Sequence, residues 1–176
     1  MTSNAPTITG ERADLLQALT KHRHFLRMTV RDLTDEQAAQ RTTISELTLA
    51  GLIKHVAATE QAWIDFVLEG PTAMGDYSNP SKADIARWTT MFRMVDGETL
   101  ASLLADYAEV ARRTDELVAS LPDLDASHPL PVAPWFEQGA SWSARRVLLH
   151  IIAETSQHAG HADIIRESLD GAKTMG

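Results

Sequence analysis

The chain has 176 residues, a formal net charge of −8 at pH 7 and no cysteine. The lack of cysteine excludes disulfides, thiolate metal ligands and a cysteine nucleophile, and the acidic charge argues against binding to nucleic acid or to a membrane surface. No apolar segment approaches the roughly 18 residues of a membrane-spanning helix, and the polar N-terminus does not resemble a signal peptide, so we expect a cytoplasmic protein with no nucleic-acid or membrane partner.

Four long segments with helical periodicity follow one another along the chain, and no strand pattern of period two persists between them. The apolar residues of each segment recur every three or four positions, which places them on one face of a helix. The predicted helices span about 12–33, 48–69, 98–120 and 143–169. Thr34 is predicted to cap a short helix or turn directly after the first helix. This pattern predicts an all-α protein: a four-helix bundle in a single domain over 1–176, with 1–10 as a flexible N-terminal tail.

Two long connections flank the third predicted helix. Residues 71–97 lead into it and include a predicted short helix at Lys82–Met94, and residues 122–140 lead out of it. Both connections are longer than the roughly two to eight residues that usually join neighbouring helices of a bundle. A simple up-down-up-down arrangement is therefore not required.

The fourth predicted helix carries the clearest chemical signal. Glu154, His158 and His161 recur about one turn apart, and His158 falls within roughly 20° of Ile151 and Ile165 on the apolar face. A carboxylate and imidazoles that face a core are costly unless a partner neutralises them, and a divalent cation would do so. The alternative is a core histidine that hydrogen-bonds to the glutamate. Because about one such spacing is expected by chance in a chain of this composition, the spacing alone does not decide between the two.

A cation with two protein ligands would be under-coordinated, so a third ligand is expected from another helix. His55 is the best candidate, because it lies at the edge of the apolar face of the second helix; the alternative is a boundary histidine bonded to a carbonyl or to water. His161 is a fourth ligand, a residue that supports a ligand, or a contact to substrate. His150 lies at the edge of the buried face and is a candidate for the same supporting role. Asp163 and Arg166 are predicted to form an ordinary ion pair on the helix surface.

Two stretches of the chain together resemble a signature of the DinB-like superfamily. The first comprises residues 33–37 (LTDEQ), 47–55 (LTLAGLIKH) and Glu60, and the second runs from Leu148 through Glu154 and His158 to Glu167. The resemblance covers nearly the whole chain. It is closest to a branch related to the metal-binding domain of mycothiol-dependent maleylpyruvate isomerase.

The resemblance implies a four-helix bundle of up-down-down-up topology, which agrees with the long crossover after the second helix. It also implies a divalent metal held by one residue of the second helix and two of the fourth, which by position are His55, Glu154 and His158. Many relatives have a histidine at the position of Glu154. Imidazole and carboxylate ligands suit zinc, which we expect first, and also nickel, iron or manganese.

Some members of the superfamily transfer thiols, so the resemblance implies a metal-dependent S-transferase that uses a mycothiol-type thiol as cosubstrate and acts on small electrophiles. Three protein ligands would leave an open metal position at which such a thiol loses its proton. Two alternatives remain: a metal-dependent hydrolase that uses a metal-bound water, and a non-catalytic metal-binding stress protein. The expected partner is a small-molecule substrate, and a homodimer is a further expectation because bundle faces often pair.

Overall fold

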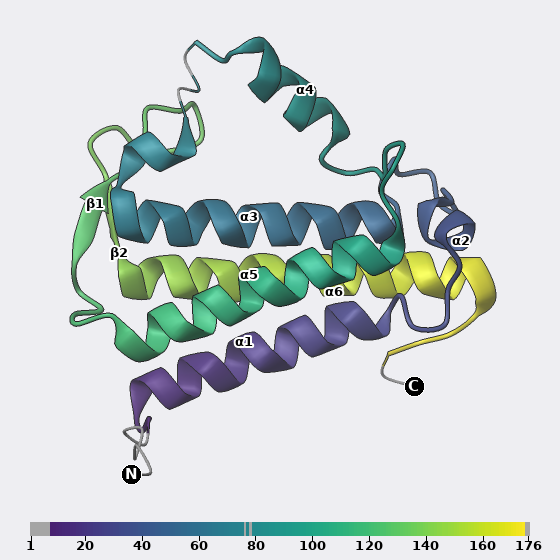
Figure 1. The fold of residues 1–176 in the computed structure, drawn as a ribbon, viewed down its shortest axis with the longest axis horizontal. Coiled ribbons are helices and arrows are strands. Elements are labelled where there is room, and N and C mark those ends of the chain that lie inside the picture. The colour runs from purple at the N-terminus through teal and green to yellow at the C-terminus, as the bar shows by residue number, and fades with distance from the viewer. Residues whose placement is uncertain (1–7, 76, 78, 175–176) are drawn as a thin grey trace.

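The computed structural model describes residues 8–75, 77 and 79–174. Its four long helices are α1 (Glu11–Met28), α3 (Leu49–Glu69), α5 (Leu100–Ser120) and α6 (Ala144–Asp170) (Figure 1). α1 and α6 run in one direction and α3 and α5 in the other, so the chain order is up, down, down, up. This confirms the predicted all-α bundle and its topology. Most of the predicted flexible tail, residues 1–7, lies outside the described residues.

The first helix ends five residues earlier than the predicted limit of 33. Asp32 has a φ of 59°, a left-handed conformation that cannot continue a right-handed helix. Two residues later, the Thr34 side chain accepts a hydrogen bond from the Gln37 amide, and the Gln37 side chain bonds back to the Thr34 amide. This reciprocal cap starts the short helix α2 (Asp35–Ala39) at the predicted position.

Hydroxyl side chains define the starts of the other long helices. Thr48 caps α3 through the amide of Gly51, Thr99 caps α5, and Ser143 caps α6. α3 ends at Gly70 and α6 ends at Gly171, both with positive φ, which glycine adopts at little cost. The three predicted ranges therefore agree with the structure to within two residues.

The connections contain short elements. η1 (Pro71–Met74) and α4 (Lys82–Thr90) lie in the crossover between α3 and α5, and α4 stops before the predicted limit of Met94. β1 (Ser127–Pro129) pairs antiparallel with β2 (Ser141–Ser143) in the connection to α6. The sequence did not predict these strands, because three residues are too few to establish a period of two.

Each long helix packs against two others: α3 against α5 and α6, and α1 against α6 and α5. The buried apolar side chains form two clusters, one at each end of the bundle. The largest fully buried side chains include Tyr107, Phe66, Leu26, Ile53 and Ile151. Within the described part of the chain, no helix has both the length and the apolar character needed to cross a membrane.

Candidate metal centre

Glu154 and His158 lie one turn apart on α6, so their side chains leave the helix on the same face. The Oε2 atom of Glu154 is 3.4 Å from the Nε2 atom of His158. The two side chains are 28% and 13% exposed, which places them at the border of the core and within reach of a small ligand.

His55 joins this pair from α3, the antiparallel neighbour of α6. One metal-binding atom of each of His55, Glu154 and His158 lies within 4.8 Å of the others. The rings of His55 and His158 meet edge to face, with their centroids 4.7 Å apart. We call these three residues the His–Glu–His group. Only the packing of α3 against α6 brings them together, because they are far apart in sequence.

The protonation states of this group suit a divalent cation. Burial and the nearby His158 lower the pKa of His55 to about 4, although Glu154 opposes the shift, so the imidazole is neutral at pH 7. The hydrogen bond from His158 holds the pKa of Glu154 below its usual value, so this residue is a carboxylate. The Nδ1 atom of His55 is buried and has no hydrogen-bond partner among the described residues. A buried polar atom without a hydrogen-bond partner lowers the stability of the folded protein by about 1–3 kcal/mol. A metal ion bound by this group would remove that cost, so the three residues fit a divalent cation.

His161 lies next to the group on α6. Its Nδ1 atom is 3.4 Å from the Nδ1 atom of His158, whereas the Nε2 atom of His158 faces Glu154. Such a contact orients a metal-binding ring and determines which of its nitrogens carries the proton. Among the described residues, His161 is not part of the set whose atoms converge within 4.8 Å. The geometry therefore favours a supporting role for His161 over that of a fourth ligand.

His150 lies one turn before Glu154, and its Nε2 atom is 3.9 Å from Glu154 Oε1, beyond hydrogen-bond distance. Burial lowers the pKa of His150. Its ring packs edge-on against Trp63 and Trp142, with centroid distances of 4.9 and 5.1 Å. His150 therefore connects the His–Glu–His group to an aromatic cluster.

The end of the crossover forms a wall on the other side of the group. The ring of Phe92 lies 4.2 Å from that of His55 and 6.4 Å from that of His158. The backbone approaches α3 closely here: a Cβ atom on Gly51 would lie only 1.8 Å from the carbonyl oxygen of Phe92. Glycine at position 51 is thus a steric requirement of this wall.

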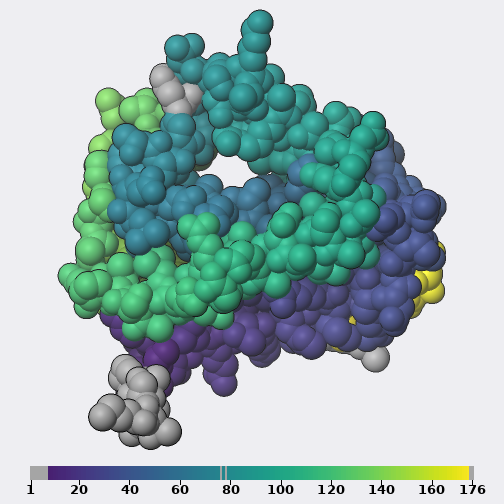
Figure 2. Space-filling view, in the orientation of Figure 1, coloured from purple at the N-terminus to yellow at the C-terminus, as the bar shows by residue number. Residues whose placement is uncertain are grey.

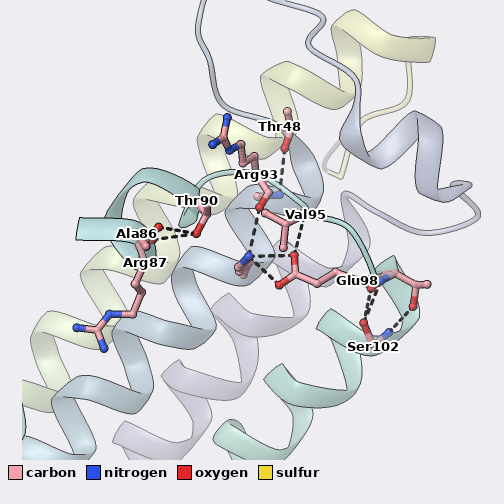
Figure 3. A network of polar contacts seen from close by, with 11 residues as sticks. Thr48, Ala86, Arg87, Thr90, Arg93, Val95, Glu98 and Ser102 are labelled. Carbon is pink, nitrogen blue, oxygen red and sulfur yellow. Dashed lines mark hydrogen bonds and ion pairs between the residues drawn. The ribbon is translucent and has the colours of Figure 1, made fainter. Parts of the chain in front are cut away.

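A polar network holds the wall in place (Figure 3). Lys54 Nζ lies 2.7 Å from the Glu98 carboxylate, which also accepts a hydrogen bond from the amide of Val95 at 2.9 Å. Lys54 also donates to the carbonyl oxygen of Arg93 at 3.4 Å. Lys54, the residue before His55 on α3, therefore attaches the segment that follows Phe92 to this helix.

The middle of the crossover stands away from the bundle. Figure 2 shows an opening between the segment around α4 and the surface of α3. None of the residues of α4 is buried. The crossover is thus attached at η1, which packs on α3, and at Phe92, while the space between these points is open to solvent.

The sequence did not predict a second polar cluster in the bundle interior. Arg23 of α1 donates from Nε to Glu60 Oε2 at 3.2 Å and from Nη1 to Asp115 Oδ1 at 2.7 Å. Thr114 Oγ1 donates to Glu60 Oε1 at 2.6 Å. The side chains of Arg23 and Glu60 are 4% and 0% exposed. Two signals in the sequence could have indicated this cluster: Arg23 lies four residues after Leu19 on the apolar face of the first helix, and Glu60 lies four residues after Val56 on that of the second.

The predicted pair of Asp163 and Arg166 is wrong. Arg166 is buried, forms an ion pair with Asp170 at 2.9 Å and donates to the carbonyl oxygens of Thr29 and Arg31. It therefore joins α6 to the turn after α1. Packing against α1 decided the choice of partner, which helix spacing alone does not reveal.

The fold and the His–Glu–His group together define the class: a DinB-like four-helix bundle with a candidate metal centre between α3 and α6. Residues 14–171 match the family model described as Mycothiol-S-transferase. The chain therefore belongs to the mycothiol S-transferase family, in agreement with the DinB-like resemblance of its sequence. Comparison with curated proteins finds no match.

Proposed function

We propose that this protein is a divalent-metal-dependent S-transferase that joins a mycothiol-type thiol to small electrophiles. The supporting observation is the convergence of His55, Glu154 and His158 within 4.8 Å in a member of the mycothiol S-transferase family. Zinc is the cation we expect first, because two imidazoles and one carboxylate are a frequent ligand set of catalytic zinc sites.

Each residue of the site has its own task. His55 and His158 would hold the cation through imidazole nitrogens, and the Glu154 carboxylate would offset part of the cation's charge. When bound, the cation supplies stabilisation of the cosubstrate's thiolate at neutral pH. His161 orients the ring of His158, and Phe92 shields one side of His55 from water.

The transfer needs no further reagent. The thiol sulfur bonds to the electrophilic carbon, the leaving group departs with its bonding electron pair, and the thiol proton passes to solvent. Since the chain has no cysteine, the reacting sulfur comes from the cosubstrate.

Turnover of mycothiol with a haloalkyl bimane, followed by fluorescence, tests the proposal in zinc-loaded protein. We expect His55→Ala to lower kcat/KM about 100-fold or more, because the metal loses a ligand. His24→Ala is the matched control, since His24 is exposed on α1. Equal turnover in wild type and His55→Ala would contradict the mechanism. Turnover without any thiol would favour a hydrolase.

Metal content gives an independent test. Elemental analysis of untagged protein should find about one divalent cation per chain in wild type and in His24→Ala, and a much smaller amount in His158→Ala. Equal metal content in all three proteins would place the cation elsewhere.

A further inference from the structure

Four side chains follow one another along α6 at intervals of four residues: Arg146, His150, Glu154 and His158. This spacing places them in a row on one side of the helix. Glu154 and His158 belong to the candidate metal centre, so the first two residues extend the row beyond it. Arg146 and Glu154 are eight residues apart, which corresponds to about 12 Å along the helix.

Aromatic rings surround the outer half of this row. Trp63 and Trp142 stack with their centroids 4.8 Å apart and an interplanar angle of 15°. Phe136 meets Trp142 edge-on at 5.9 Å, and His150 contacts both indoles. Trp142, Phe136 and His150 are only half-buried, so part of this cluster is available to a ligand. We call these four residues the aromatic end of the site.

Arg146 carries a positive charge at this end and has no ion pair with a carboxylate in the described part of the chain. Its guanidinium lies 4.2 Å from the centre of the Trp142 ring, and the residue is exposed. Among the described residues, no Asp or Glu lies within ion-pair distance of it, whereas the neighbouring Arg145 pairs with Glu11 and Asp125.

We propose that the electrophile accepted by this site is a planar aromatic or conjugated molecule that bears an anionic group roughly 10 Å from its reacting carbon. This inference rests on the proposed function, since it assumes that the reacting carbon meets the thiol beside the His–Glu–His group. The ring of the molecule would contact the aromatic end, and its anionic group would lie beside Arg146.

Binding of an unreactive probe tests the inference without turnover. Biphenyl-4-sulfonate has two flat, conjugated aromatic rings and one anionic group and is a weak metal ligand, and 4-(methylsulfonyl)biphenyl is its uncharged counterpart. Isothermal titration of zinc-loaded and metal-free wild type should show about three- to tenfold tighter binding of the sulfonate, as expected for one partly exposed ionic contact. Equal affinity for the two probes would overturn the inference.

Variants of Arg146 test whether its guanidinium contacts the anionic group of the probe. Because Arg146 is exposed, Arg146→Gln should fold normally and lose the preference for the sulfonate, and Arg146→Glu should reverse it. Arg41→Gln is the control, since Arg41 is an exposed cation with a long ion pair of 3.8 Å to Glu46. A preference that persists in Arg146→Glu would show that the anion binds elsewhere.

A reactive acceptor separates this inference from the proposed function. In 4′-(bromomethyl)biphenyl-4-sulfonate the C–S bond forms as bromide leaves with the bonding pair. With this acceptor, Arg146→Gln should raise the KM of the acceptor about three- to tenfold and leave that of mycothiol within about twofold. A rise in the KM of mycothiol instead would assign this end of the site to the thiol and overturn the inference. If wild type binds the sulfonate through Arg146 but transfers no thiol, the proposed function fails and the anion site stands.

Discussion

Two polar clusters lie between the helices of this bundle, and they differ in how completely their groups are paired. In the cluster of Arg23, Glu60 and Asp115, every buried charge meets an opposite charge, and the hydroxyl of Thr114 supplies a further hydrogen bond. In the His–Glu–His group, the Nδ1 atom of His55 has no partner among the described residues. The first cluster is complete without a ligand, and the second is not. Among the described residues, buried polar atoms without a partner also occur at Arg27, Tyr107 and Thr155, so it is the convergence of three ligand-type side chains beside such an atom that distinguishes the His–Glu–His group from the structural ion pair.

The largest effect on stability is expected in the complete cluster. Glu60→Ala removes the fully buried partner of Arg23 and leaves the guanidinium with only the partly exposed Asp115. We expect the free energy of unfolding to fall by about 3–5 kcal/mol. Urea unfolding followed by circular dichroism measures it. Glu69→Ala, at the exposed end of the same helix, is the control and should change the value by less than about 0.5 kcal/mol.

Zinc should stabilise the folded protein by binding to the His–Glu–His group, whereas the cluster of Arg23, Glu60 and Asp115 should not bind it. At a zinc concentration one hundred times the Kd, we expect the wild type to gain about 2.7 kcal/mol of stability. His158→Ala should lose most of this gain and differ little from wild type in its metal-free form. Thermal unfolding with zinc and with EDTA measures both quantities. An equal gain in the two proteins would mean that the cation binds outside the group.

His161 should affect metal affinity more weakly than the three converging residues. If it orients the ring of His158 through the 3.4 Å contact between their Nδ1 atoms, His161→Ala should weaken zinc binding about 10- to 100-fold. Competition with a chromophoric chelator measures the Kd. An affinity equal to that of wild type would indicate that His161 contacts substrate rather than supporting His158.

The smallest effect concerns pH. In the metal-free protein the pKa of His55 is about 4, below the value of 6.5 that we expect in the unfolded chain. Between these values the unfolded chain binds a proton that the folded protein does not, so stability falls as the pH decreases from about 6.5 to 4. Because the ring is partly exposed, we expect a loss of about 1–2 kcal/mol from this residue.

Urea unfolding of metal-free wild type and His55→Phe at pH 7 and at pH 5 checks this expectation. The variant should lose less stability between the two pH values than the wild type. An identical loss in both proteins would show that His55 is protonated equally in the folded and unfolded states.

Local patterns were sufficient for most of the fold. Helix periodicity predicted the limits of three long helices to within two residues, and in the structure hydroxyl caps at Thr48, Thr99 and Ser143 define their starts, since both signals involve residues within one or two turns. The end of the first helix was missed, because the left-handed conformation of Asp32 leaves no mark in hydrophobic periodicity.

For the site, the sequence by itself determined the row on α6, since a spacing of four residues fixes a shared helix face wherever the helix lies. It also singled out His55, by its place on a helix face and by family resemblance. Only the tertiary structure decided that His55 meets Glu154 and His158, that Arg23 is neutralised by Glu60, and that Arg166 donates to the turn after α1. These contacts depend on how helices distant in sequence pack together, and packing is a property of the whole bundle.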